Sequence, residues 1–184
     1  MIIGITGTLG AGKGTISEYL IKKGFKHYSV RDFLTEEVKK RNLPLNRESL
    51  VNVANDLRKK HSPSYIVEKL FEIAKENNEN CIIESIRTEG ELISLQNKGG
   101  IVLAIDADPK IRFNRIKKRN SYTDNIDFKQ FLEDEKKEMT SDDPNKQNLS
   151  KCIQLADYKI ENNKSIEDLY MNIEKVIKNA KEKN

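Results

Sequence analysis

The chain has 184 residues, of which 36% are hydrophobic and 34% charged, and its formal net charge is +4. This length suits one α/β domain, and so balanced a charge gives no reason to expect nucleic acid as a partner. No apolar stretch approaches the ~20 residues of a membrane span, and the first strand is expected at residue 2, which leaves no room for a signal peptide. We therefore expect a cytoplasmic protein with no membrane partner.

Short apolar runs alternate with amphipathic segments along the whole chain. In chain order we predict strand 2–6, helix 13–23, strand 25–28, helix 32–41, helix 47–60 capped by Asn46, a helix begun by Ser62-Pro63, strand 81–83, a helix around 92–95, strand 101–105, a helix from Asp108-Pro109, strand 158–160 and a helix opened by 165–168. This alternation implies a parallel sheet with right-handed crossovers. Ligands of such sheets bind beyond the carboxyl ends of the strands.

The two cysteines, Cys81 and Cys152, lie far apart and form no Cys-x-x-Cys pair. A structural zinc site is therefore not expected. Both sit among apolar residues, which favours buried thiols in a reducing compartment over redox chemistry.

Residues 7–15, directly after the first strand, read Gly-x-x-Gly-x-Gly-Lys-Gly-Thr. A glycine-rich turn between a buried strand and a helix is the context of a phosphate-binding P-loop, in which backbone N–H groups converge on an anion. The helix N-terminus adds its positive dipole end and Lys13 adds a mobile charge for the β- and γ-phosphates. We assign ATP binding to Gly10, Ala11, Gly12, Lys13, Gly14 and Thr15.

The position after Lys13 is Gly14, and the hydroxyl comes one residue later, at Thr15. The Ser/Thr that ordinarily binds Mg²⁺ directly is therefore absent. Nucleotide oxygens and water would hold most of the ion, with Thr15 as a minor ligand, which suits a metal that keeps part of its hydration shell.

Polar and charged residues follow three other strands: 29–35 after the second, 84–88 after the third and 106–108 after the fourth. These strand ends are expected to face one crevice beside the P-loop. Arg87 lies directly beyond a buried strand, and a bidentate phosphate contact is the natural reason for a cation there.

With the P-loop as its most specific part, nearly the whole chain resembles the P-loop nucleoside monophosphate kinases. It is adenylate kinase-like and especially similar to archaeal adenylate kinase-related proteins and to P-loop domains associated with deoxycytidylate deaminases. The resemblance implies a P-loop NTPase fold of nucleotide kinase type, an α/β domain over 1–184 with a parallel five-stranded sheet of order 2-3-1-4-5 flanked by helices. It also implies an acceptor-binding helical region at 32–76 and a small helical lid at 120–150.

The resemblance assigns acceptor binding to the end of the second strand, where Ser29, Asp32 and Leu34 match the family's Ser/Thr-x-x-Asp-x-Leu-Arg. Its arginine position holds Thr35 here, and Arg31 is the suggested replacement. Arg87 aligns with the arginine that grips the acceptor phosphate, and Glu84 with the acidic residue that orients Mg²⁺ through water.

Arg115 and Arg119 resemble the arginines where a helix enters the lid, and with Lys13 and Arg87 they form the expected catalytic set. No arginine follows Arg119, although adenylate kinases usually carry further lid arginines. Other residues get simpler predictions. Arg58 either reaches the acceptor or lies on a solvated face, and Arg112 lies on the surface. His27 and His61 have no partner that would make either of them a base or a metal ligand, and Phe128, Phe131 and Leu132 are expected to pack. Residues 156–162 resemble the last strand of nucleotide kinases and dephospho-coenzyme A kinases.

The expected function is ATP-dependent, Mg²⁺-assisted transfer of the γ-phosphoryl group to a nucleoside or deoxynucleoside monophosphate. One alternative is a dephospho-coenzyme A kinase-like small-molecule kinase, in which Asp32 could act as the base that an alcohol acceptor needs. Another is a nucleotide-binding regulatory ATPase, which the sparse lid arginines favour. The resemblance also suggests a functional link to a deoxycytidylate deaminase. The sequence fixes neither the acceptor's base and sugar nor the oligomeric state.

Overall fold

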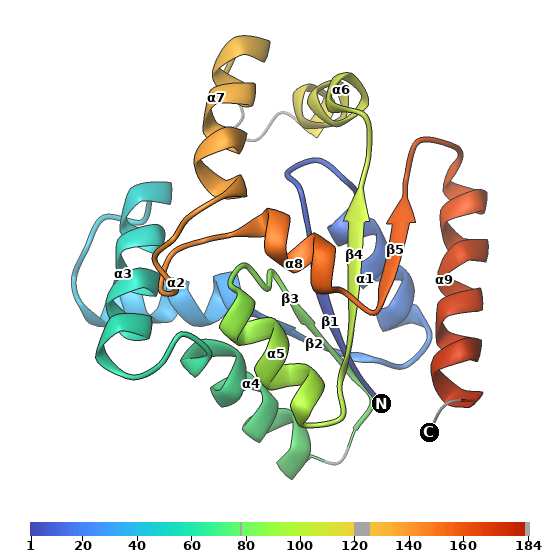
Figure 1. Ribbon diagram of the computed structural model, residues 1–184, viewed down its shortest axis with the longest axis horizontal. Helices are drawn as coiled ribbons and strands as arrows, with labels where there is room; N and C mark the ends of the chain where they lie inside the picture. The colour runs from blue at the N-terminus through green and yellow to red at the C-terminus, as the bar shows by residue number, and fades with distance from the viewer. Residues whose placement is uncertain (78, 120–125, 183–184) are drawn as a thin grey trace.

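The computed structural model describes residues 1–77, 79–119 and 126–182. A parallel sheet of order β2-β3-β1-β4-β5 forms its centre (Figure 1), which confirms the predicted fold class and strand order. The strands are β1 Ile2–Gly7, β2 Lys26–Ser29, β3 Cys81–Glu84, β4 Ile101–Asp106 and β5 Tyr158–Glu161. Because every pairing is parallel, the carboxyl ends of all five strands lie at one edge of the sheet.

Helices connect the strands and cover both faces of the sheet. They are α1 Lys13–Lys22, α2 Val30–Lys40, α3 Arg47–Lys60, α4 Tyr65–Glu76, α5 Glu89–Asn97, α6 Pro109–Arg119, α7 Phe128–Met139, α8 Leu149–Leu155 and α9 Ile166–Glu182. In the part of the chain described, none of these helices is long and apolar enough to cross a membrane.

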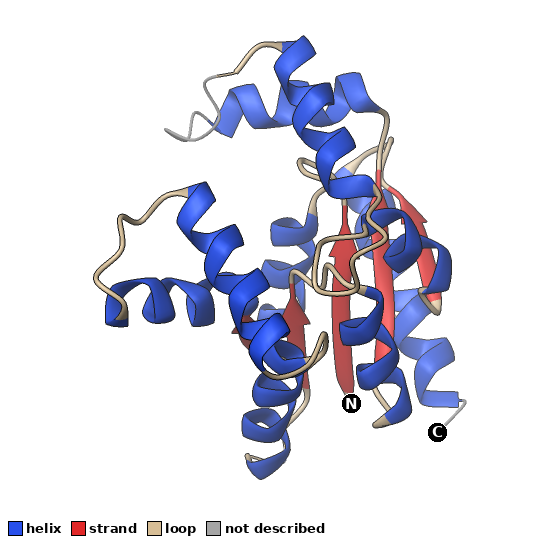
Figure 2. Ribbon diagram, turned by 60° about the vertical axis from the view of Figure 1, so that its left-hand side comes forward, coloured by secondary structure: helices blue, strands red, loops and turns tan. Residues whose placement is uncertain are grey.

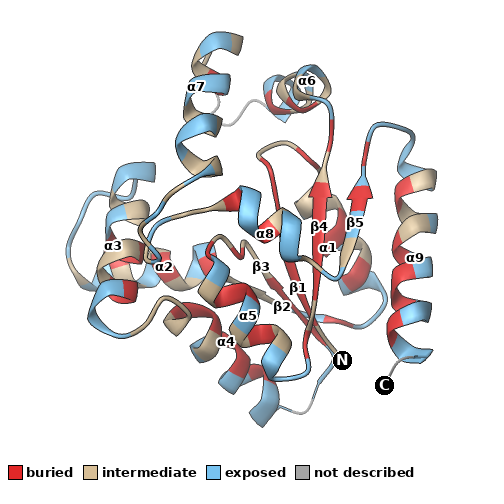
Figure 3. Ribbon diagram, in the orientation of Figure 1, coloured by how far each residue is buried: buried red, intermediate tan, exposed pale blue. Residues whose placement is uncertain are grey.

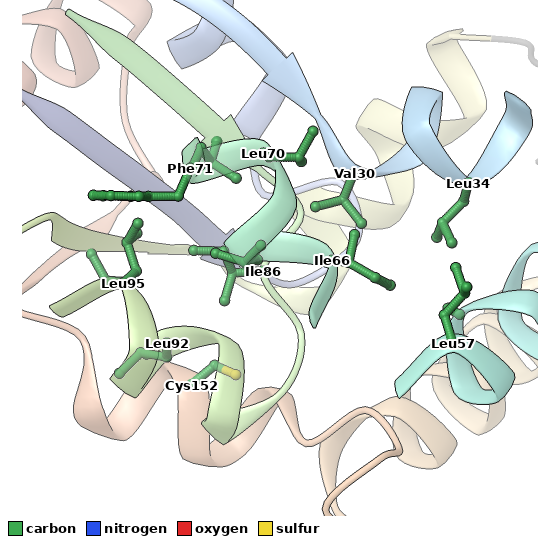
Figure 4. Close-up of a cluster of buried hydrophobic side chains, with 14 of the residues drawn as sticks. Val30, Leu34, Leu57, Ile66, Leu70, Phe71, Ile86, Leu92, Leu95 and Cys152 are labelled. Atoms are coloured by element: carbon green, nitrogen blue, oxygen red, sulfur yellow. The ribbon is translucent and has the colours of Figure 1, made fainter. Parts of the chain in front are cut away.

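The alternation of side chains along β1 divides the core between the two faces, which Figure 3 shows as buried strands between half-buried helices. Ile3 and Ile5 point to the face covered by α1 and α9. The other face carries α4, α5 and α8 and continues into α2 and α3, where Leu34 and Leu57 point toward each other (Figure 4). Gly4 points to this face, and a Cβ there would lie 2.4 Å from Ile86 Cδ1. Glycine thus lets the loop after β3 pack directly on β1.

Two helix starts differ from the predictions for local reasons. The Ser29 hydroxyl accepts a hydrogen bond from the Asp32 N–H, so α2 begins at Val30 rather than at residue 32. Ser62-Pro63 was expected to open a helix, but Ser64 is the N-cap and α4 begins at Tyr65. The Thr88 hydroxyl donates to the Pro63 carbonyl, so this turn is tied to the start of α5 instead.

Helix α8 has no counterpart among the predicted elements. It is capped by Asn148 and buries Leu149 and Cys152 on the face of β1 and α5. Cys81 is buried as well, and burial raises the pKa of the Cys81 thiol to about 11 and that of Cys152 to about 12. Both cysteines therefore serve as the small apolar residues expected from the sequence.

Helix α7 lies within the segment expected to form a helical lid. Residues 120–125 of that segment, Ser121 and Asp124 among them, fall outside the described residues. Phe128 and Phe131 pack against Phe113 of α6, with ring centroids 5.2 and 5.7 Å from it, as packing residues should, whereas Leu132 is 39% exposed and was wrongly expected to pack. Figure 2 shows α6 and α7 projecting above the strand ends, with α2 and α3 projecting beside them.

Candidate active site

A cleft of about 820 Å³ opens at the carboxyl ends of β1, β2 and β3, between the glycine-rich loop, α2, α3, α6 and α7. It brings together residues that the sequence placed at separate strand ends. The predicted residues that line it are Gly10, Gly12, Lys13, Gly14, Thr15, Ser29, Arg31, Arg58, Glu84, Arg87, Arg115 and Arg119. Two others do not line it, since the Ala11 side chain is buried and Asp32 is exposed outside it.

The loop has the geometry of an anion cradle. Gly12 is the N-cap of α1 with φ of 106°, and the first-turn N–H groups that follow it have no acceptor within the helix. Lys13 Nζ folds back onto the loop and donates to the carbonyls of Gly7 and Thr8 at 2.9 and 2.8 Å. Burial, together with the charge of Arg87, lowers the pKa of Lys13 to about 8. The loop thus holds a cation that is poorly hydrated and therefore favours an anionic ligand.

Three side chains from later elements brace the loop. Asn162 Nδ2, just after β5, donates to the Ala11 carbonyl at 2.8 Å. The Thr8 hydroxyl donates to Asp106 at 2.6 Å. Arg112 was expected on the surface, which is wrong, because it is 3% exposed and donates to the Leu9 and Ala107 carbonyls. Arg112 also pairs with Glu135, so it connects α7 to the loop.

Two glycines of the loop should respond very differently to alanine. A Cβ at Gly12 would lie 2.4 Å from Asn162 Nδ2 and would sit at a left-handed φ, whereas a Cβ at Gly14 would meet nothing within 4 Å. We expect Gly12→Ala to displace Asn162 and weaken ATP binding by at least about tenfold, since strain of this kind costs on the order of 1–3 kcal/mol. Gly14→Ala is the matched control and should bind ATP within about twofold of wild type. Isothermal titration calorimetry measures both, and equal losses would contradict the prediction.

Glu84 ends β3 beside Lys13 and carries a partner that the sequence did not reveal. His27 Nε2 lies 3.1 Å from Glu84 Oε2, so the expectation that His27 has no partner is wrong. His61 also has a ring neighbour, because it stacks on Tyr65. Burial raises the pKa of the Glu84 carboxyl, but the hydrogen bond with His27 and the charge of Lys13 outweigh burial, so this pKa lies below its usual value.

The donors near the loop fit a magnesium ion only together with a nucleotide. Among residues 1–77, 79–119 and 126–182, no group of three or more His, Cys, Asp or Glu residues could hold a metal ion. Glu84 is ionised at neutral pH and lines the cleft, as Thr15 does, so it is able to hold Mg²⁺ through water. Phosphate oxygens would supply the remaining ligands, which suits an ion that dehydrates reluctantly.

Arg87 reaches into the cleft from the loop after β3, as predicted. Its Nη1 donates to Glu138 and to Gln147, both at 2.9 Å. Its backbone is fixed from behind, because the Arg87 N–H donates to Glu91 Oε2 at 2.9 Å. The backbone that carries the guanidinium is therefore held in place. The guanidinium lines the same cleft as Lys13, and its charge lowers the pKa of Lys13.

Arg58 lines the cleft, and the expectation that it could lie on a solvated face is wrong. Its Nε and Nη2 both donate to Glu91 Oε1, at 2.9 and 2.7 Å. The side chains of Arg58 and Glu91 are 2% and 0% exposed. Arg58 touches the cleft wall, but its charge neutralises the carboxylate that holds Arg87 in place.

The lid-side arginines differ in what holds them. Arg115 Nη2 donates to the Asn162 carbonyl at 2.9 Å, while its Nη1 is buried and has no hydrogen-bond partner within the described residues. Burial lowers the pKa of Arg115. Arg119 and Arg31 are exposed residues that line the cleft.

Arg47, Glu138, Arg112, Asn162 and His27 were missed as site residues. Only Asn162 lay in a quoted motif, at the end of 156–162. Arg47 is the first residue of α3 and Glu138 lies near the end of α7, and both line the cleft. Neither position is next to a strand end, so no rule about strand ends would have selected them.

Comparison with known proteins gives the family and the fold. Residues 3–141 match a family model described as an AAA domain. UPF0200 protein PH1008 of Pyrococcus horikoshii is 30% identical over 185 residues, covering 96% of both chains. Shikimate kinase from Bacteroides thetaiotaomicron has a TM-score of 0.60 at 12% identity, covering 96% of both chains. Dephospho-CoA kinase from Campylobacter jejuni has a TM-score of 0.56 at 18% identity, covering 96% of this chain and 95% of that one.

At such low identities the two kinase structures are similar to this chain in fold alone. The relative and the family model each cover enough of the chain to assign it to a family. The chain belongs to the UPF0200 family, contains an AAA domain over residues 3–141 and has the P-loop kinase fold that its resemblance to adenylate kinase-like proteins predicted.

Proposed function

We propose that this protein transfers the γ-phosphoryl group of ATP to a nucleoside or deoxynucleoside monophosphate. The observation that carries the proposal is the placement of two cations at the ends of neighbouring strands. Lys13 follows β1 and Arg87 follows β3, and both face one cleft. A triphosphate in the loop and an anionic acceptor at Arg87 would therefore meet end to end, which is the in-line arrangement that phosphoryl transfer needs.

The roles of the other residues follow from this arrangement. An acceptor phosphate oxygen forms the new bond to the γ-phosphorus, the bond to the β–γ bridging oxygen breaks, and ADP leaves with that electron pair. Lys13 and the loop N–H groups stabilise charge on the transferred group, and Arg115 and Arg119 approach from α6. Mg²⁺ bound to the phosphates, with Glu84 acting through water, would supply further charge neutralisation. Movement of the helices in 32–60 and of the segment 120–150, which is expected to form a lid, would exclude water from the cleft.

The charges in the cleft favour an anionic acceptor over an alcohol. An alcohol needs a carboxylate base, and Asp32, considered for that role, lies outside the cleft. Glu84 and Glu138 do line the cleft. Burial raises the pKa of each carboxyl, but His27 and Lys13 outweigh it at Glu84, and Arg87 and Arg47 outweigh it at Glu138. Both pKa values lie below the usual value, so both groups are poor bases. A monophosphate is already a nucleophilic anion and needs no base.

An acceptor panel tests the proposal. The protein is incubated with ATP and Mg²⁺ and with single nucleoside monophosphates, their deoxy forms or dephospho-coenzyme A, and ADP is measured. We expect ADP formation only with a monophosphate acceptor. ADP formation with dephospho-coenzyme A alone would show that the protein is a small-molecule kinase of the dephospho-coenzyme A kinase kind and that the acceptor is not a nucleoside monophosphate. ADP formation that does not depend on any acceptor, or none at all, would favour a regulatory ATPase.

Binding of ATP should weaken as the pH rises above 8. The pKa of Lys13 is about 8 in the free protein, and a bound phosphate would raise it, because the anion favours the charged amine. ATP binding would therefore take up a proton near pH 8. The affinity would be full well below pH 8 and would fall by up to about tenfold per pH unit above it. Calorimetry in two buffers of different ionisation enthalpy measures this uptake, and its absence between pH 7.5 and pH 9 would argue against the assignment.

A further inference from the structure

One carboxylate in the cleft lies between two arginines from different elements. Glu138 of α7 accepts a hydrogen bond from Arg87 Nη1 at 2.9 Å through Oε2 and one from Arg47 Nη2 through Oε1. Its side chain is 14% exposed, against 24% for Arg87 and 45% for Arg47. The two cations come from the start of α3 and from the loop after β3, and each binds a different oxygen of the carboxylate.

The contacts of this carboxylate differ from the exposed ion pairs on the helix surfaces, because they lie in the cleft. Glu138, Arg87 and Arg47 all line the cleft, and the charges of Glu138 and Arg87 reach Lys13 closely enough to change its pKa in opposite directions. Two guanidinium groups that each bind one oxygen of the same anion form a fork suited to a phosphate. Their combined charge of +2 matches a phosphate dianion better than it matches a single carboxylate.

We propose that Arg47 and Arg87 together bind the phosphate dianion of the acceptor, and that Glu138 is an internal occupant of this site which the incoming phosphate displaces. The inference rests on the proposed function and names the feature of the acceptor that is recognised. Arg47 then supplies the arginine that the sequence lacks at Thr35. Arg31, the replacement suggested by the sequence, also lines the cleft and is the second residue of α2.

Displacement of Glu138 has a structural consequence. The pair between Arg47 and Glu138, reinforced by Asp134 at 3.7 Å from Arg47 Nη1, connects the start of α3 to α7 across the cleft. Entry of a phosphate would break this connection and restore the lost charge pairing with its own oxygens. A neutral nucleoside would bring no anion to replace the carboxylate, so the same arrangement of Arg47, Glu138 and Arg87 would discriminate against nucleosides.

Binding measurements with charge variants test the proposal. A non-hydrolysable ATP analogue first fills the P-loop, and AMP, dCMP and inorganic phosphate are then titrated by calorimetry, with adenosine and deoxycytidine as uncharged controls. We expect Glu138→Gln to tighten binding of the phosphate ligands at least fivefold and to leave the nucleosides unchanged. Arg47→Gln should weaken the same ligands at least tenfold without changing the affinity for the ATP analogue.

Matched variants control for general effects of charge. Glu133→Gln removes an exposed carboxylate from the same helix, and Lys60→Gln removes an exposed cation from the far end of α3. Both should bind phosphate ligands like wild type. Thermal unfolding of each variant shows whether it is folded. If Arg47→Gln does not fold, the double variant Arg47→Gln/Glu138→Gln takes its place and should lose the gain seen in Glu138→Gln.

The outcomes separate this inference from the proposed function. Unchanged or weaker phosphate binding in Glu138→Gln would overturn the inference and leave the Arg47–Glu138 pair as a structural link, even if the acceptor panel shows phosphoryl transfer. Tighter phosphate binding in Glu138→Gln would support the anion site, even if the wild-type protein transfers no phosphoryl group to any acceptor. Absence of phosphate binding in both the wild type and Glu138→Gln would also overturn the inference.

Discussion

Replacing Lys13 with methionine is expected to reduce acceptor-dependent ADP formation by at least about 10²–10³-fold, the loss seen when one preorganised charge donor is removed from a transition state. Methionine keeps the length and the apolar stem of the side chain. The lysine amine donates to the carbonyls of Gly7 and Thr8, and thermal unfolding of the variant shows whether the protein folds without these two bonds. Initial-rate measurements at saturating acceptor test the prediction.

The control for Lys13 lies on the same helix. Lys22→Met removes an exposed cation from the last turn of α1 and should leave the rate within about twofold of wild type, as is usual for a surface change. Full activity in Lys13→Met would remove the P-loop from the mechanism. Equal losses in both variants would indicate a general effect of net charge on the protein rather than a role for the cation in the cradle.

The sequence predicted the sheet, its strand order and most of the cleft because these depend on short-range patterns. Apolar runs mark the buried strands, and parallel strands bring their carboxyl ends to one edge, so the residues just after β1 and β3 had to meet. The loop was predictable for the same reason, since Gly10 and Gly12 have positive φ and were required by the turn itself. Lys13 and Arg87 followed from their positions next to these strands.

The partners of the charged side chains could not be predicted in this way. Arg58 and Arg112 are buried and Arg31 is exposed, yet all three lie on helices rich in charged residues. The local sequence therefore does not distinguish a buried arginine from an exposed one. Only tertiary packing decides that Glu91 or the loop carbonyls lie within reach of those two arginines. A buried arginine can be identified only when its partner is known. Glu91 is 33 residues from Arg58 in the sequence, and Leu9, whose carbonyl accepts from Arg112, is 103 residues from it.

Helix α7 shows the same limit at the level of a whole element. Its packing residues Phe128 and Phe131 were identified from the sequence, yet the polar residues that make it part of the cleft were not. Glu135 and Glu138 lie on a helix with many similar carboxylates, and only their contacts with Arg112 and Arg87 set them apart. Helix α8 was missed because seven residues with two buried side chains give too short a pattern to recognise.

Removal of the Arg58 side chain should be the most destabilising single change considered for this protein. Arg58→Met leaves the Glu91 carboxylate buried without its cation, and breaking a buried pair from one side costs on the order of 3–5 kcal/mol of unfolding free energy. Arg41→Met is the matched control. Its partner Asp56 is 35% exposed, so the loss there should be under about 1 kcal/mol. Denaturant unfolding of the two variants measures the difference.

A second substitution distinguishes a buried charge from lost packing. Glu91→Gln added to Arg58→Met removes the uncompensated charge and keeps an oxygen that accepts from the N–H groups of Arg87 and Thr88, which Glu91 Oε2 binds at 2.9 and 3.2 Å. The double variant should therefore regain at least about 1–2 kcal/mol over Arg58→Met, because an unsatisfied buried charge costs more than a neutral group that keeps its hydrogen bonds. No recovery would mean that Arg58 stabilises the protein through the packing of its stem. Recovery of stability together with an acceptor KM above that of the wild type would show that the pair also sets the position of Arg87.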